Sequence, residues 1–213
     1  MGSLFLVRHA TTEASSSGRN LGRRADPPLT DDGRELAVRS GVAIAAELAA
    51  LPHDRLRVVS SPARRCRETA APIATAIGVA AGAVEVDPAL LEIDYGAWDG
   101  LTADECLERD PQLRAAWEED PYHITAPGGE SGADVAARAF PALAELEAWL
   151  AADRARAAVA VSHNHVVRLH LTAVLGLPLP DYRRRVVANP GGYSVITVAP
   201  GARVVRRVNV LPA

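Results

Sequence analysis

Residues 4 to 19 read LFLVRHATTEASSSGR, and this stretch indicates the fold class. Its four leading apolar residues, bounded by polar ones, are typical of a short strand that is buried on both faces. The strand ends directly in Arg8 and His9, and a polar loop over residues 11–30 follows. Loops of that length without apolar periodicity are often functional. The charged pair is therefore either a solvated edge or the floor of an active site.

Two other segments share this pattern. Residues 56–61 (LRVVSS) and 156–163 (RAAVAVSH) are short and apolar, and each ends in polar residues that open a predicted helix. Residues 191–200 and 202–211 alternate apolar and polar side chains, which predicts a hairpin. Strands that alternate with helices predict an α/β fold, here a three-layer α/β/α sandwich with a mostly parallel central sheet.

The expected helices have recognisable ends. Thr30 is a predicted N-cap, and Asp31 and Asp32 follow in a first turn where the helix dipole favours acidic side chains. That helix should run to the break at Pro52. Further helices are expected over residues 62–78, 102–119 with a break at Pro111, 131–152 and 164–176, and short extended segments over 83–87 and 89–94. The absence of repeats and linkers predicts one domain, residues 1–213.

Composition excludes several classes of function. A formal net charge of −3 and a pI near 6.1 provide no global basic field for nucleic acid. All 23 basic residues are arginine, so lysine Schiff-base and Walker-type chemistry is excluded. Cys66 and Cys106 form neither a disulfide framework nor a metal cluster, and no signal peptide or apolar run of membrane-spanning length is evident. We therefore expect a cytoplasmic protein with no membrane partner.

The candidate catalytic residues follow the carboxyl ends of the predicted strands. In a parallel sheet the carboxyl ends of strands form the ligand crevice, which would bring together Arg8, His9, an arginine of the ARR segment at 63–65, and His163. Guanidinium groups suit the oxygens of a phosphate dianion, and a neutral imidazole can attack phosphorus. Glu92 lies among apolar residues, where we expect desolvation to raise its pKa and fit it for general acid catalysis.

Five segments in order resemble the motifs of the histidine phosphatase superfamily, in its phosphoglycerate-mutase-like branch. They are LVRHATTE (6–13), SSPARRCRETA (60–70), LLEIDYGAWDG (90–100), PGGES (127–131) and VSHNHVVR (161–168). The resemblance extends from residue 4 to about residue 176. It implies a single domain of the phosphoglycerate mutase-like fold, with a small cap formed by the loop 11–30 and the insert 100–130.

The resemblance also implies roles for single residues. His9 matches the histidine that becomes phosphorylated, Arg8 its phosphate-binding neighbour, and Glu92 the general acid and base. Arg65, rather than Arg64, matches the second phosphate-binding arginine, and His163 matches the second histidine of the pocket. The implied substrate-binding residues are Thr11, Ser15, Arg19, Leu21, Gly22 and Asn164. No metal and no cofactor are implied.

The chain departs from the family pattern in several places. The glycine that usually follows the nucleophile is Ala10, which adds a methyl group near the pocket, and the glycine pair after the second histidine is replaced by Asn164 and His165. Thr11 and Ser15 stand where a glutamate and an asparagine are common. His163 and His165 could also be read as a metal-binding pair, but no further ligands lie at suitable spacing. The role of His165, at the pocket rim or in local packing, stays open, as does that of His123.

The leading hypothesis is a metal-independent phosphatase that hydrolyses a small phosphorylated metabolite, a sugar phosphate or a phosphoglycerate-like molecule, through a phosphohistidine on His9. The alternatives are a cofactor-dependent phosphoglycerate mutase and a catalytically inactive binding relative. The short insert between Glu92 and PGGES favours water as the acceptor, and hence hydrolysis. Arg19, Arg23 and Arg24 could bind a second acidic group of the substrate. An exposed edge strand could support a homodimer.

Overall fold

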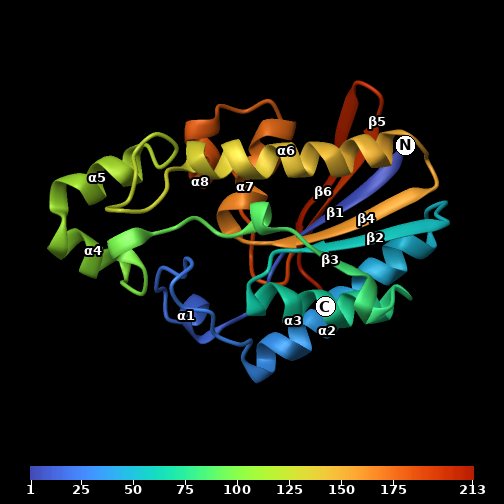
Figure 1. The fold of residues 1–213 in the computed structure, drawn as a ribbon, viewed down its shortest axis with the longest axis horizontal. Coiled ribbons are helices and arrows are strands. Elements are labelled where there is room, and N and C mark those ends of the chain that lie inside the picture. The colour runs from blue at the N-terminus through green and yellow to red at the C-terminus, as the bar shows by residue number, and fades with distance from the viewer.

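A mixed six-stranded sheet forms the centre of the protein (Figure 1), as the computed structural model of residues 1–213 describes it. The strands lie in the order β3-β2-β4-β1-β5-β6, where β3, β2, β4 and β1 run parallel and β5 and β6 are antiparallel. Their bounds are Gly2–Arg8 (β1), Arg55–Ser60 (β2), Val84–Val86 (β3), Arg156–Ser162 (β4), Tyr193–Ala199 (β5) and Ala202–Val210 (β6). The predicted α/β fold with a mostly parallel sheet is confirmed.

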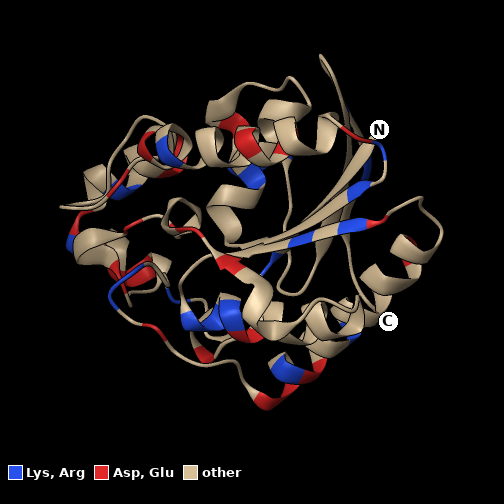
Figure 2. Cartoon of the chain, turned by 45° about the vertical axis from the view of Figure 1, so that its right-hand side comes forward, with Lys and Arg blue, Asp and Glu red and all other residues tan.

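Helices cover both faces of this sheet. The long helices α2 (Asp31–Ala49) and α3 (Arg64–Ala76) pack on one face, and α6 (Gly132–Ala151) and α7 (Asn164–Val174) pack on the other (Figure 1). The shorter helices are α1 (Glu13–Ser16), α4 (Ala103–Arg109), α5 (Pro111–Glu119) and α8 (Tyr182–Arg185), with 3-10 turns at Ala81–Ala83, Pro88–Leu90, Gly96–Trp98 and Leu179–Asp181. Acidic and basic residues are interspersed over these helices (Figure 2).

The first strand shows why the sheet is buried on both faces. Leu4 and Leu6 join the hydrophobic core beneath α6 and α7, whereas Phe5 and Val7 join the core beneath α2 and α3. All four side chains are fully buried. Successive side chains of a strand point to opposite faces, so a central strand between two helical layers needs an unbroken apolar run. The LFLV segment meets this requirement.

Some elements differ from the sequence-based expectations. The loop 11–30 contains the one-turn helix α1, because Thr12 and Ser15 form a capping box that nucleates it. Residues 89–94 are not extended throughout: Asp87 accepts the N–H of Ala89 and starts a 3-10 turn. The helix expected from residue 62 begins at Arg64, because the N–H of Ser61 still bonds the carbonyl of Val161.

Other expectations are confirmed. The segment 102–119 forms two helices that are separated at Pro111, and residues 193–210 form the predicted hairpin. Ser131 caps α6 and Thr30 caps α2, as their sequence positions suggested. None of the helices combines the length and the apolar character that crossing a membrane requires.

Strand register places the site. β1 and β4 pair in parallel with Arg8 opposite Ser162, so His9 and His163 both follow neighbouring strand ends. The N–H of His9 also bonds the carbonyl of Ser162 (2.9 Å). Ser60 at the end of β2 pairs with Val161 of β4, which brings the segment before α3 to the same edge of the sheet.

Candidate active site

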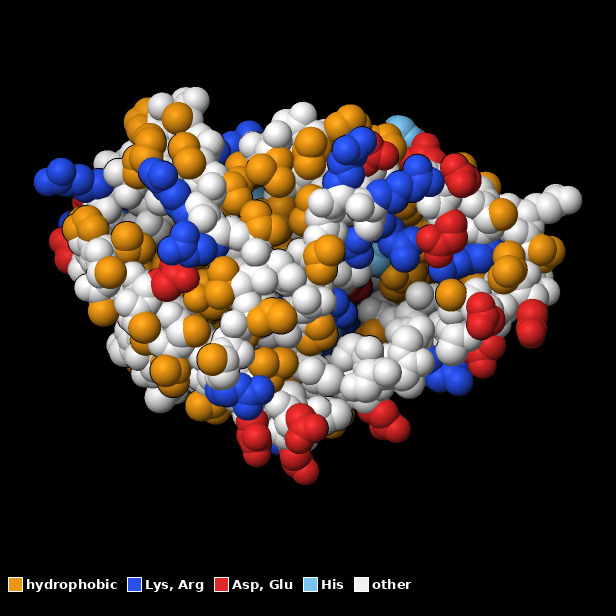
Figure 3. All heavy atoms as spheres, turned by 180° about the vertical axis from the view of Figure 1, so that it is seen from behind, with side chains coloured by type: hydrophobic (Ala, Val, Ile, Leu, Met, Phe, Trp, Pro, Cys, Tyr) orange, Lys and Arg blue, Asp and Glu red, His pale blue; other side chains and the backbone are white.

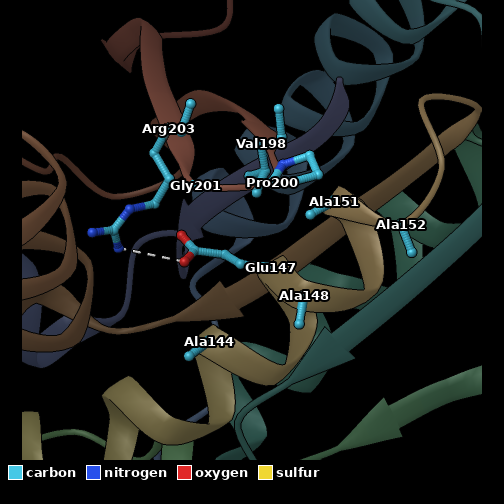
Figure 4. A pocket seen from close by; sticks show the side chains of 11 residues that line it. Ala144, Glu147, Ala148, Ala151, Ala152, Val198, Pro200, Gly201 and Arg203 are labelled. Carbon is cyan, nitrogen blue, oxygen red and sulfur yellow. Dashed lines mark hydrogen bonds and ion pairs between the residues drawn. The ribbon is translucent and has the colours of Figure 1, made fainter.

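Two cavities of the structure are relevant, and their chemistry differs. The larger one, about 600 Å³, lies between the carboxyl half of α6 and the β5–β6 turn, and most of its lining residues are alanines (Figure 4). Its charged residues, Glu147 and Arg203, are bonded to each other (3.4 Å), and Glu147 also contacts His170 (2.9 Å). This cavity therefore has no unpaired group for catalysis.

The smaller cavity, about 180 Å³, lies at the carboxyl ends of the parallel strands. A hollow beside basic side chains is visible on the face shown in Figure 3. The cavity is lined by Arg8, His9, Ser15, Gly18, Arg19, Asn20, Leu21, Glu92, Tyr95 and Asn164. It is polar and holds most of the residues that the sequence selected, so it is the candidate active site.

His9 is a neutral imidazole in this cavity. Its Nδ1 lies 2.8 Å from the carbonyl oxygen of Ala10, and since a carbonyl can only accept, Nδ1 carries the proton. The lone pair is then on Nε2. Burial, together with the positive charges of Arg65 and Arg8, lowers the pKa of His9 to about 3. A neutral imidazole with a free Nε2 can act as a nucleophile toward phosphorus.

Arg8 is a partly buried cation that lines the cavity, and Arg65 is a fully buried cation that is not among the lining residues. Arg8 donates from Nη1 to the carbonyl of Ala188 (2.7 Å), and Arg65, which is 1% exposed, donates from Nη2 to that of Gly22 (2.9 Å). The Nε atoms of both are buried without a hydrogen-bond partner. The only carboxylate near Arg65 is Asp26, at 3.6 Å. Buried guanidinium groups with unpaired N–H donors are suited to binding an anion.

Arg64, the alternative considered for the second arginine, has a different position. Its side chain is about half exposed, and Nε pairs with Glu68 (2.6 Å) on the surface of α3. Arg65 is the one whose charge acts on His9. The one-residue difference in a helix turns the side chain by about 100°, enough to move it from the site to the surface.

His163 caps α7 with its backbone and directs its ring toward His9, with the two ring centroids 5.2 Å apart. Its Nε2 lies 2.8 Å from the hydroxyl of Ser61 and 3.4 Å from Sγ of Cys66. Burial and then the charge of Arg65 hold the pKa of His163 well below its ordinary value. The first residue of α7, Asn164, lines the cavity, so the amino end of this helix faces it.

Glu92 lines the same cavity, but the expectation that its pKa is raised is wrong. Burial alone raises the pKa of this carboxyl, whereas His165, His163 and the N–H of Ile93 lower it by more, so the net shift is downward. Oε1 accepts the N–H groups of Ile93 (2.9 Å) and His165 (3.2 Å). The apolar sequence around Glu92 did not show that α7 brings the N–H and the ring of His165 to it.

The backbone of Glu92 is fixed by the PGGES segment. Arg23 and Arg138 both donate to the carbonyl of Glu92 (2.8 and 3.0 Å). Glu130 binds both guanidinium groups, at 2.8 and 3.0 Å. The backbone of Asp94 approaches so closely that a Cβ at Gly129 would lie 2.2 Å from its carbonyl oxygen, which explains the glycine there. The segment therefore positions the carboxylate and does not itself line the cavity.

His165 is a residue that sequence reasoning did not assign to the site. It is 1% exposed, and its Nδ1 lies 3.3 Å from Oε1 of Glu92, which is local packing against the acid rather than a place at the rim. The spacing of two residues from His163 gave no indication of this, because the turn into α7 decides where the ring points. His123 is exposed, pairs with Asp120 (2.8 Å) and does not line the cavity.

The predicted substrate-binding residues divide into two groups. Ser15, Arg19, Leu21 and Asn164 line the cavity, whereas Thr11 and Gly22 do not. The carbonyl of Thr11 accepts the N–H of Thr30, and Gly22 is engaged with Arg65. The lining residues that the sequence did not select are Gly18, Asn20 and Tyr95. The methyl group of Ala10 packs with Leu29 and Ala37, away from the cavity.

The loop 11–30 is bonded to the segment that opens the insert. The N–H of Asn20 bonds the carbonyl of Leu101 (2.9 Å), and Arg19 pairs with Glu105 (2.9 Å). The carboxylate of Asp99 accepts the N–H groups of Gly22, Arg23 and Arg24. These bonds hold the loop over the cavity. No group of three or more His, Cys, Asp or Glu side chains is arranged to hold a metal ion.

Comparisons with known proteins agree with this geometry. A sequence model of the histidine phosphatase superfamily (branch 1) matches residues 4–211. A glucosyl-3-phosphoglycerate phosphatase of Mycolicibacterium vanbaalenii is 36% identical over 184 residues, 84% of this chain and 76% of that protein. Phosphoserine phosphatase 1 of Hydrogenobacter thermophilus is 32% identical over 210 residues, 97% of this chain and 92% of that protein.

Solved structures are similar as well. A mycobacterial glucosyl-3-phosphoglycerate phosphatase, solved as a complex with VO3, superposes with a TM-score of 0.83 at 28% identity, covering 99% of this chain and all of that one. Some curated relatives are much longer than this chain. Three mycobacterial proteins are 42% identical to it over 137 residues, which make up 63% of this chain but 34% of each relative.

The buried neutral histidine predicts a pH dependence of stability. Because the pKa of His9 is about 3 in the fold and about 6.5 in unfolded chains, the unfolded state binds the proton first. The contribution of His9 is fully present above pH 6.5 and is lost as the pH falls toward 3, about 1.4 kcal/mol by pH 5.5. Urea unfolding of the wild type and of His9→Asn at pH 7.5 and 5.5 should show a smaller loss in the variant. An equal loss in both would contradict a neutral His9.

Proposed function

The chain belongs to the histidine phosphatase superfamily, branch 1, and we propose that it is a metal-independent phosphatase of a small phosphorylated metabolite. The observation that carries this proposal is the free Nε2 of His9 near Arg8 and Arg65, whose Nε–H groups are buried without a partner. The relatives named above are phosphatases, which supports the same activity.

The residues present account for both halves of a hydrolysis. In the first half, Nε2 of His9 bonds to phosphorus, the bond from phosphorus to the ester oxygen breaks, and a proton on Glu92 passes to that oxygen. In the second half, water bonds to phosphorus, the bond to Nε2 breaks, and the carboxylate of Glu92 takes the proton of the water. Arg8 and Arg65 neutralise the phosphoryl oxygens throughout.

The lowered pKa of Glu92 fits this cycle when the substrate is considered. A phosphate dianion beside the carboxylate disfavours a further negative charge, so binding raises the pKa of Glu92. A substrate that enters as a monoanion can supply the proton. Glu92 is then protonated for the first half and ionised for the second.

The substrate class is proposed to be a sugar phosphate or a phosphoglycerate-like molecule. The small cavity and the phosphorylated substrates in the relatives' names support it. Arg19 and Arg23, which we expected to bind a second acidic group, pair with Glu105 and Glu130 instead. We propose that the loop 11–30 and the insert 100–130 act as a cap of this single domain, since their backbones are bonded together.

The expectations about the protein's location and binding partners stay predictions. They are a cytoplasmic location, a small phosphorylated substrate as partner, no nucleic acid or membrane partner, and a homodimer through an exposed edge strand. The edge strand β6 has exposed valines, Val204 and Val208, together with three arginines.

An activity assay tests the function directly. In the presence of EDTA, the wild type should release phosphate from 3-phosphoglycerate or an aryl phosphate, and His9→Ala should lower kcat by about a thousandfold or more, since loss of a nucleophile has effects of that size. Formation of 2-phosphoglycerate without free phosphate would instead support the mutase. A folded wild type without turnover of any ester would support an inactive binding protein.

Arg65 and Arg64 form a matched pair of variants. Arg65→Gln should lower kcat/KM by about a hundredfold to a thousandfold, as expected for loss of a group that stabilises transition-state charge. Arg64→Gln removes the same charge one residue away, on the surface, and should stay within about twofold of the wild type. Thermal unfolding of both variants controls for folding. Equal losses in the two would contradict the assignment of Arg65.

A further inference from the structure

The carboxylate of Glu92 is held through one of its two oxygens. Oε1 accepts the backbone N–H groups of Ile93 and His165 and also faces the ring of His165. Oε2 has no hydrogen-bond partner in the protein, and it is not among the buried unpaired atoms. Since Glu92 lines the cavity, Oε2 is the oxygen that can exchange a proton with a bound molecule.

The ring of His165 lies between Glu92 and Tyr95. Its Nδ1 is 3.3 Å from Oε1 of Glu92, close enough for an ion pair but off the direction of a hydrogen bond, and its Nε2 is 3.4 Å from the hydroxyl of Tyr95. Burial raises the pKa of Tyr95, so this phenol keeps its proton and can donate it to Nε2. That contact assigns the proton of the neutral ring to Nδ1, on the side of Glu92.

Aromatic side chains fix the orientation of this ring. Its centroid lies 5.5 Å from that of Tyr95, 5.7 Å from that of Tyr182 and 6.3 Å from that of Trp117. Arg183 of α8 stacks on Trp117, with its guanidinium carbon 4.4 Å from the ring centroid. A histidine enclosed in this way cannot turn away from the carboxylate without displacing its neighbours.

The charged and titratable groups around the pair come from several elements. Burial alone raises the pKa of Glu92, and the histidines of α7 and its cap lower it by more. Burial lowers the pKa of His165, and Glu92 raises it in part. The groups that act on the two are Arg8 and His9 at the end of β1, Tyr95, His163 before α7, Arg168 on α7, and Tyr182 and Arg183 on α8.

We propose that His165 is a positioning residue for catalysis: it holds Oε1 of Glu92 and so directs Oε2 toward the ester oxygen that leaves phosphorus. The inference rests on the proposed phosphatase activity. Without the ring, the two backbone N–H groups still bind Oε1, but the carboxylate loses its contact with Nδ1 of His165. Oε2 is then less well placed to deliver its proton as the ester bond breaks.

This role has a signature that depends on the leaving group. A nitrophenolate leaves phosphorus without needing a proton, whereas an alkoxide needs one as the bond breaks. Impaired proton delivery therefore slows an alkyl phosphate more than a nitrophenyl phosphate. A loss of packing alone would slow both esters by the same factor.

Two substitutions separate the contact from the packing. His165→Leu keeps an apolar side chain of similar size but has no N–H, and His165→Asn keeps an amide N–H near the position of Nδ1. For His165→Leu, kcat/KM for glycerol phosphate should fall about tenfold further than for p-nitrophenyl phosphate. His165→Asn should keep the ratio of the two values within about threefold of the wild type.

The pH profile is a second readout. Because the ring lowers the pKa of Glu92, its removal in His165→Leu should move the alkaline limb of kcat, which reports the substrate complex, upward, and His165→Asn should leave that limb near its wild-type position. If His165→Leu does not fold, Tyr95→Phe removes the phenol that directs the ring's proton to Nδ1. That variant should move the limb and the ratio in the same directions by a smaller factor.

The outcomes distinguish this inference from the function on which it rests. A wild type that hydrolyses neither ester would overturn the proposed function. An active wild type whose His165→Leu variant slows both esters equally and keeps the alkaline limb in place would overturn the role of His165 alone. The same holds for Tyr95→Phe if that variant has to be used.

Discussion

The guanidinium groups of Arg8, which is partly buried, and Arg65, which is fully buried, lie near His9, and the chemistry of the site depends on this arrangement. The one carboxylate paired with either is that of Asp26, 3.6 Å from Arg65. Burying an unpaired charge is costly, so the surrounding fold must hold both groups in place. Burial, together with the positive charges of Arg65 and Arg8, lowers the pKa of His9 and keeps it neutral. In the proposed function, a phosphate dianion bound between the two cations relieves the same cost. The site is therefore poised for a phosphate group before any substrate is present.

The scaffold accounts for how these groups come together. The parallel pairing of β1 with β4 fixes His9 against Ser162, and the turn into α7 brings His163 and His165 to the same edge. Glu92 lies in a segment without regular secondary structure. Arg23 and Arg138 both donate to its carbonyl, and Glu130 holds the two guanidinium groups in place. A regular sheet thus positions His9, the proposed nucleophile, and an ion-pair network positions Glu92, the proposed acid.

Much of this could be predicted from the sequence, for definite physical reasons. Apolar runs that end in Arg8-His9 and Ser162-His163 indicate buried parallel strands, and their carboxyl ends must share one edge. The choice of Arg65 over Arg64 needed the resemblance to a family, since the start of a helix is uncertain by a residue or two from sequence alone. The charge state of Glu92 could not be predicted, because it depends in part on the N–H and the ring of His165, which lies 73 residues further along the chain in α7. The cavity lining by Asn20 and Tyr95 depends likewise on loop bonds that leave no pattern in the sequence.

The measurement that tests the central claim most directly is the site of covalent phosphorylation during turnover. The enzyme is mixed with a saturating phosphate ester and quenched in alkali, which preserves phosphohistidine, and the peptides are then analysed by mass spectrometry. We expect one phosphoryl group on His9, attached to Nε2, that forms at least as fast as the ester turns over. Turnover with the phosphoryl group on another residue, or with none on the protein under conditions that preserve phosphohistidine, would contradict it.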